Sequence, residues 1–163
     1  MRRTILAVLI VLLSATGTLA AAQVLRVPVL RGQRGMPPPP PSIEMMRADM
    51  VARSGSDTVY FAGSGFGIDA AAQATLTAQA RWLRANPAVR ARIEGHADER
   101  TPRDFALAIG KRRADAVRDY LVLLGVPASQ LTIISWGKER PAAEGTGEMA
   151  LALNRRVSTV LMR

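Results

Sequence analysis

Cysteine is absent from the 163-residue chain, and histidine occurs once, as His96. Without cysteine the chain cannot form a disulfide framework, a thiolate metal site or a thioether bond to a lipid. A zinc site would have to be built almost wholly from carboxylates, which is an uncommon ligand set. We therefore expect no metal, no other cofactor and no lipid anchor of the lipoprotein type.

Aromatic residues are also scarce, at 4% of the chain, although 22 lysine and arginine residues outnumber 13 aspartate and glutamate residues for a net charge of +9. Proteins that bind nucleic acid interleave aromatic with basic side chains on one face. The shortage of aromatics therefore argues against nucleic acid as a partner. The basic excess suits anionic cell-wall polymers and lipid head groups better.

The first 22 residues have the pattern of a secretory signal peptide. Arg2 and Arg3 supply a positive start, residues 5–13 are an unbroken apolar run, and residues 14–22 are small and weakly polar. We expect cleavage after Ala22, which predicts a periplasmic or envelope protein, outer-membrane association included. The alternative is an uncleaved anchor in the inner membrane, because residues 5–22 approach the length that spans a bilayer.

We predict that residues 23–56 form a proline-rich linker and a short lead-in. One folded domain is predicted at 57–163. Prolines occupy positions 37–41, and such a run favours extended polyproline II. A chain of this length has room for one domain of ordinary size. A two-domain enzyme with an interdomain cleft is therefore not expected.

Helix and strand patterns alternate through the rest of the chain. Apolar residues recur at three- and four-residue steps in 69–85, with Asp69 as N-cap, and in 101–124, with Thr101 as N-cap. Strands are predicted at 58–61, 89–93, 131–136 and 157–162, Gly95 closing the second, with short helices at 43–51 and 148–154. Residues 63–67 are interpreted as a loop only. This predicts an α/β (α+β) sandwich of βαβαβ(α)β order, with helices on a small mixed four-stranded sheet.

The second long helix carries a charge on its apolar stripe. Arg113 falls four residues after Ile109 and four before Val117, so the three share a face. A guanidinium away from water is costly unless it is paired and hydrogen-bonded. The natural partner is Asp98, just past the preceding strand, where ligand sites of α/β folds gather. Two interpretations stay open: a ligand site with both signs of charge, or a structural salt bridge.

Four sequence blocks occur in a specific order: EGHADER at 94–100, GKRRADAV at 110–117, SWGKERP at 135–141 and NRRV at 154–157. Together they resemble the OmpA-like C-terminal domain family, and most closely its peptidoglycan-associated lipoprotein (Pal) branch. The resemblance covers about residues 57–163. It implies a Gram-negative envelope protein that is not an enzyme.

The resemblance also implies non-covalent binding of peptidoglycan through the meso-diaminopimelate of the stem peptide. Asp98 and Arg113 match the family's primary binding residues, and Arg100 and Arg155, in the same blocks, are secondary candidates. Asp98 would accept from the ligand's ammonium group, while Arg113 would grip the carboxylate on the same carbon. By analogy, a further partner would be a Tol-system protein such as TolB.

The chain departs from the Pal pattern at several positions. Ala106 replaces an asparagine, which implies the loss of one polar contact with the ligand. Thr101 replaces a glycine and Ala62 an aspartate, so the rim of the pocket is less acidic. The lipobox cysteine is also missing, which favours a soluble periplasmic protein or one tethered to the inner membrane by an uncleaved N-terminal helix.

An enzymatic alternative is a wall hydrolase that uses Asp98 and Glu99 as acid and base. Adjacent residues of an extended segment point to opposite sides, whereas paired carboxylates must flank one bond. The spacing therefore favours a binding module over an enzyme.

Overall fold

The computed structural model describes residues 39–163, so the predicted signal or anchor at 1–22 and the linker residues 23–38 lie outside the described residues. Among the described residues, no helix is both long and apolar enough to cross a bilayer. The elements in chain order are α1 (Ile43–Ser54), β1 (Thr58–Tyr60), α2 (Ala70–Ala85), β2 (Arg90–His96), α3 (Arg103–Leu123), a 3-10 turn η1 (Ala128–Gln130), β3 (Leu131–Gly137), α4 (Glu148–Asn154) and β4 (Arg156–Met162).

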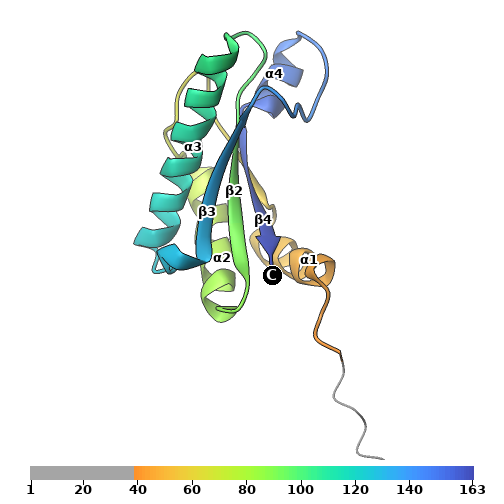
Figure 1. The fold of residues 1–163 in the computed structure, drawn as a ribbon, viewed down its shortest axis with the longest axis vertical. Helices are drawn as coiled ribbons and strands as arrows, with labels where there is room; N and C mark the ends of the chain where they lie inside the picture. Colours follow the sequence, from red (N-terminus) through yellow and green to blue (C-terminus); the bar gives the residue numbers. More distant parts are fainter. Residues whose placement is uncertain (1–38) are drawn as a thin grey trace, which may run out of the picture. The chain divides into compact units, whose positions relative to one another are not determined.

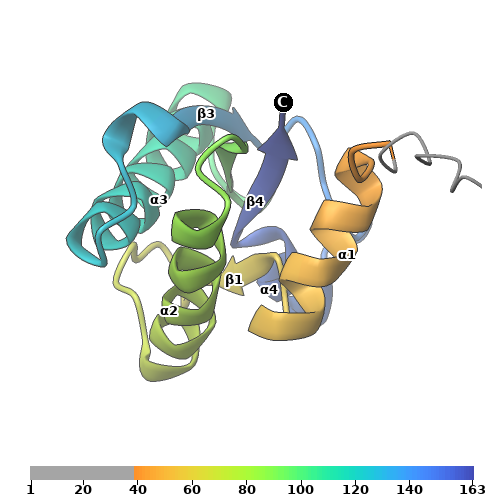
Figure 2. The ribbon, with the colours of Figure 1, turned by 90° about the horizontal axis from the view of Figure 1, so that it is seen from below.

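The four strands form one mixed sheet in the order β1-β4-β2-β3. β2 and β3 are parallel and are joined through the crossover helix α3, whereas β4 is antiparallel to β1 and β2. α2 and α3 pack on one face of the sheet (Figures 1 and 2). The predicted fold class is confirmed. The carboxyl ends of β2 and β3 lie together at the top of Figure 1.

One apolar core lies between the sheet and the helices. Its fully buried side chains include Leu76 of α2, Ile93 of β2, Leu121 of α3 and Met50 of α1. α1 also contacts α2 and β4, and Figure 2 shows it beside β4. The compact unit is Pro39–Arg163. It therefore begins before residue 57, the predicted domain start, because α1 completes the core with Met50.

The two long helices begin differently. Asp69 caps α2 as predicted, since its Oδ1 accepts from the backbone N–H of Ala72 at 2.7 Å. Thr101 was expected to cap α3, but Pro102 occupies the N-cap position and provides no side-chain hydrogen bond. Thr101 lies instead in the preceding loop, where its carbonyl oxygen accepts from Nζ of Lys138 at 2.9 Å. The N-cap of α3 is thus one residue later than predicted, and Lys138, which directly follows β3, contacts the loop before it.

The second strand does not end at Gly95 as predicted but continues to His96. Gly95 is fully paired in the sheet, opposite Ser135 of β3 and Val157 of β4. A Cβ at Gly95 would lie 1.9 Å from the carbonyl oxygen of Gly110 in α3. The glycine therefore marks a close approach of helix to strand and not a chain break. The other predicted elements end within three residues of the observed bounds.

Candidate functional site

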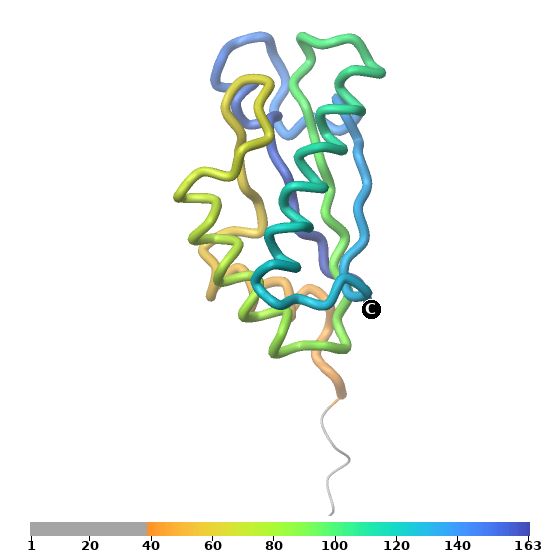
Figure 3. Tube along the Cα trace, turned by 90° about the vertical axis from the view of Figure 1, so that its left-hand side faces the viewer, coloured from red at the N-terminus to blue at the C-terminus, as the bar shows by residue number. Residues whose placement is uncertain are grey.

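A pocket of about 260 Å³ opens at the carboxyl end of β2. Figure 3 shows that the loop after β1, the loop after β2 and the segment around α4 meet at this end of the molecule, although they are far apart in the sequence. The pocket is lined by Gly63, Ser64, Ala97, Asp98, Arg100, Thr101, Ile109, Arg113 and Arg155. All four residues predicted for the site therefore lie in one pocket.

Arg113 is buried, with 1% of its surface exposed, and its guanidinium is held by backbone carbonyls. Nε donates to Gly65 at 2.9 Å, Nη1 to His96 at 3.0 Å and Nη2 to Gly63 at 2.6 Å. The guanidinium also lies over the ring of Phe61, 5.3 Å from its centroid. Residues 63–67, interpreted from sequence as a loop only, therefore supply two of the acceptors that make this burial possible.

Asp98 does not pair with Arg113, contrary to the salt-bridge interpretation. Its Oδ2 accepts from Nη2 of Arg100 at 2.8 Å and from Nη1 of Arg155 at 3.2 Å. The described residues show no ion pair between Asp98 and Arg113. Backbone carbonyl oxygens hold the guanidinium of Arg113 instead. The aspartate and the arginine thus remain as two separate charges facing one pocket.

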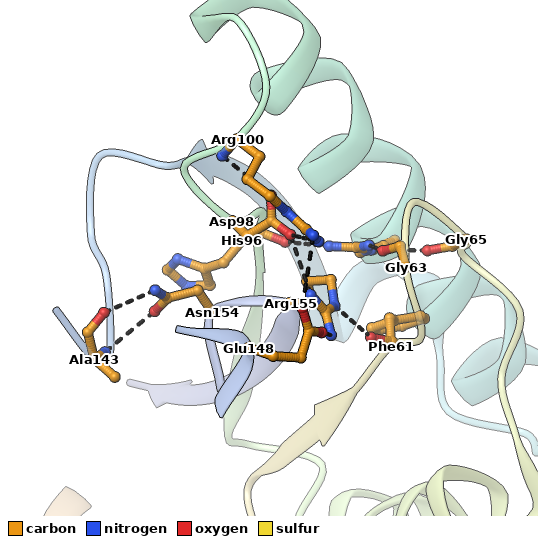
Figure 4. Close-up of polar contacts among 11 residues, drawn as sticks. Phe61, Gly63, Gly65, His96, Asp98, Arg100, Ala143, Glu148, Asn154 and Arg155 are labelled. Carbon is orange, nitrogen blue, oxygen red and sulfur yellow. Dashed lines mark hydrogen bonds and ion pairs between the residues drawn. The ribbon is translucent and has the colours of Figure 1, made fainter. Parts of the chain in front are cut away.

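Arg155 ties this cluster together, as Figure 4 shows. It directly follows α4 and is buried, and each guanidinium nitrogen has a partner. Nε donates to the carbonyl oxygen of Phe61 at 3.2 Å, Nη1 to Asp98, and Nη2 to Glu148 of α4 at 2.7 Å. Arg155 therefore joins the loop after β1, the loop after β2 and α4.

Asp98 and Arg113 both stay ionised near neutral pH. Burial acts to raise the pKa of Asp98, but hydrogen bonds from Arg100 and Arg155 outweigh it and leave the pKa below its usual value. Burial lowers the pKa of Arg113 to about 10; the charge of Asp98 opposes this change and that of Arg155 adds to it. Asp98 is therefore a carboxylate and Arg113 a cation at pH 7.

Both primary residues retain hydrogen-bonding capacity. A guanidinium has five N–H donors, and Arg113 uses one on each nitrogen for backbone carbonyls. One N–H therefore remains on each of Nη1 and Nη2, which is the arrangement that grips a carboxylate bidentately. Oδ1 of Asp98 accepts only a long contact, 3.3 Å, from the N–H of Arg100. That oxygen is left for a cationic donor.

A family model described as the OmpA family matches residues 60–155, a span that contains every charged residue of this pocket. The chain belongs to the OmpA family. The resemblance stated from the ordered sequence blocks is thus confirmed.

Curated relatives of this OmpA-family chain carry the name peptidoglycan-associated lipoprotein. The chain is 49% identical over 105 residues to the protein of Rhizobium meliloti (strain 1021), covering 64% of this chain and 60% of the relative. It is 47% identical over 105 residues to that of Agrobacterium fabrum, covering 64% and 59%. The chain therefore matches less than two thirds of the length of these relatives.

Solved structures agree with this assignment. The crystal structure of the peptidoglycan-associated lipoprotein from Burkholderia pseudomallei is 38% identical, with a TM-score of 0.65 over 66% of this chain and 92% of that one. The C-terminal domain of Helicobacter pylori MotB is 20% identical, with a TM-score of 0.62 over 66% and 84%. The latter likeness supports the OmpA-like fold alone.

Two positions that depart from the Pal pattern have different surroundings in this OmpA-family domain. Ala106 is fully buried against Ala97 and Ile109 and does not line the pocket. Thr101 does line it, and its buried hydroxyl has no hydrogen-bond partner among the described residues. Thr101 therefore lines the pocket although its hydroxyl oxygen is buried, while position 106 contributes only packing.

Sequence reasoning missed the acceptors of Arg113 and the part played by Glu148. Backbone carbonyls leave no residue-type signal, and Glu148 lies outside the four ordered blocks. Glu99, named in the hydrolase alternative, is exposed and is not among the pocket-lining residues. The described residues contain no group of histidine and acidic side chains that could hold a metal ion.

Proposed function

We propose that this OmpA-family domain binds peptidoglycan non-covalently, through the diaminopimelate residue of the stem peptide, and so contributes to the integrity of the cell envelope. The observation that carries the proposal is the pocket itself. Asp98 and Arg113 face one space, and neither is neutralised by the other. The names of the curated relatives support peptidoglycan as the polymer that is bound.

The chemistry of diaminopimelate matches the hydrogen-bonding groups that Asp98 and Arg113 have left unused. One end of diaminopimelate carries an ammonium and a carboxylate on a single carbon. The ammonium is placed to donate to Oδ1 of Asp98, and the carboxylate to accept from the free N–H groups of Arg113. A stem peptide with a residue lacking this zwitterion would leave Oδ1 of Asp98 and the two remaining N–H groups of Arg113 without ligand contacts, so selectivity follows from the cost of that loss.

The same geometry favours binding over catalysis. A hydrolytic pair needs an acid whose pKa is near the working pH and a second carboxylate across one bond. Asp98 has a lowered pKa, and it is the one carboxylate among the described residues that line the pocket. We propose that the chain is a binding module and not a hydrolase.

We propose a location in the periplasm or elsewhere in the cell envelope, where peptidoglycan is found. An uncleaved N-terminal segment would place the chain at the inner membrane. A Tol-system protein such as TolB is a proposed protein partner, supported only by the likeness to the Pal relatives.

Co-sedimentation with purified sacculi tests the function. We expect Asp98→Ala and Arg113→Ala each to lower the apparent affinity for sacculi by about tenfold or more, because each leaves a buried charge unpaired. Matched controls are Asp104→Ala and Arg112→Ala, which remove the same groups from exposed positions of α3. Circular dichroism would establish that each variant is folded. Undiminished binding by folded Asp98→Ala and Arg113→Ala variants would refute the proposed site.

A further inference from the structure

The pocket has one positive charge that a zwitterion cannot balance. Its charge network contains Arg100, Arg113 and Arg155 against Asp98 and Glu148, three cations to two anions. The ammonium and carboxylate on one carbon of diaminopimelate add no net charge. Binding of that group alone therefore leaves the network with a surplus of one positive charge.

The surplus positive charge lies on Arg100, at the mouth of the pocket. Arg113 and Arg155 are buried, and every nitrogen of Arg155 is already hydrogen-bonded. The Arg100 side chain is 53% exposed, and its contact with the exposed Glu148 is long, at 3.6 Å from Nη1 to Oε2. Nη2 holds Asp98, which leaves Nε and Nη1 of Arg100 free to take a stronger partner.

Arg100 also connects the pocket to the surface beyond it. The same side chain lines a neighbouring groove together with Glu99, Lys138, Glu139 and Thr146. Arg100 is the one exposed charged residue among the described residues that line the pocket, so it is the charge that the outer part of a ligand held by Asp98 and Arg113 would meet. In diaminopimelate three methylene groups separate the two amino-acid carbons, so the second carbon and its carboxylate form this outer part.

We infer that the pocket selects stem peptides whose diaminopimelate carries a second, free carboxylate, and that Arg100 is the specificity residue that binds it. This inference rests on the proposed function. Diaminopimelate at the end of a tripeptide has both carboxylates free, whereas in longer or amidated stems the second one is converted to an amide. The preferred ligand class is thus the dicarboxylate form, which brings the charge network to neutrality.

Calorimetric titration with two synthetic peptides tests the inference. One is L-Ala-γ-D-Glu-meso-diaminopimelate, and the other is the same tripeptide with only its main-chain diaminopimelate carboxylate amidated. We expect the full-length protein to bind the free form roughly threefold to tenfold more tightly, as for one charge-assisted hydrogen bond at a half-exposed site. In Arg100→Gln the two peptides should bind equally, and no more tightly than the amide binds to the unmodified protein, because the variant also loses the contact of Arg100 with Asp98.

Arg103→Gln is the matched control, because Arg103 is an exposed arginine nearby that pairs with Glu139 and does not line the pocket. This variant should keep the preference for the free carboxylate. Equal binding of both peptides by the unmodified protein, or a preference that survives Arg100→Gln, overturns the inference and leaves the proposed function standing. Failure of both peptides to bind overturns the two together.

Discussion

Gly95 and Gly110 bring the backbone of α3 against β2, directly below the pocket. A Cβ at Gly110 would lie 2.4 Å from Oγ of Ser135 and 2.9 Å from the carbonyl oxygen of Gly95. Ser135 in turn donates to the carbonyl oxygen of Leu107 at 2.7 Å. Because Arg113 lies less than one turn after Gly110, this spacing sets the depth at which its guanidinium enters the site.

Gly95→Ala should therefore destabilise the fold strongly, by about 3 kcal/mol or more, since its methyl group would meet backbone and not a movable side chain. Urea denaturation followed by circular dichroism measures the change. Gly67→Ala is the matched control, because nothing lies within 4 Å of a Cβ there. Equal stabilities of the two variants would show that α3 can shift away from β2 at little cost.

Among the elements, α4 is short but holds Arg155 at the pocket. Asn154, its last residue, fixes it to the preceding loop: Oδ1 accepts from the N–H groups of Ala142 and Ala143 at 2.7 and 3.2 Å, and Nδ2 donates to the carbonyl oxygen of Ala143 at 2.8 Å. Figure 4 shows the contacts with Ala143. The next residue, Arg155, donates a hydrogen bond to Asp98. α2, by contrast, contributes to the core and contains none of the pocket-lining residues.

Asn154→Ala and Asp69→Ala should separate these two roles. Loss of the α2 cap in Asp69→Ala should cost about 1 kcal/mol of stability and leave sacculus binding unchanged. Asn154→Ala removes three hydrogen bonds, so we expect a loss of about 2 kcal/mol together with weaker binding, because Arg155 loses its support. Thermal unfolding and co-sedimentation measure the two effects. Full binding by Asn154→Ala would mean that α4 does not position Arg155.

The whole molecule should respond to acid through its single histidine. His96 is 2% exposed, and its Nδ1 has no hydrogen-bond partner among the described residues. Burial, and then the charge of Arg156, lower its pKa from 6.5 to about 4. Between these values the unfolded chain binds the proton and the folded chain does not. Stability is therefore complete above pH 6.5 and declines as the pH falls toward 4.

Lowering the pH from 7.5 to 5 should reduce the free energy of unfolding by about 2 kcal/mol through this residue. Urea titrations at a series of pH values measure the decline. His96→Gln should flatten the profile over this range, since most carboxylates titrate below it. A profile of the same slope in both proteins would exclude His96 as the source.

The sequence alone determined the elements, the family and the burial of a charge. Periodicity predicted α2, α3, α4 and the four strands, because helix and strand repeats are local properties of the chain. The ordered blocks indicated the OmpA family, and the stripe between Ile109 and Val117 predicted that Arg113 is buried, as it is.

Only the tertiary structure decided the partners of each charge. Asp98 accepts from Arg155, 57 residues away, and Arg113 donates to Gly63, 50 residues away. Sequence reasoning matched the charges by sign and nearness and so paired Asp98 with Arg113. Folding satisfied Arg113 with backbone carbonyls, which any residue type provides. Because those acceptors and long-range distances leave no pattern in the sequence, the free capacity of the pocket could be recognised only in three dimensions.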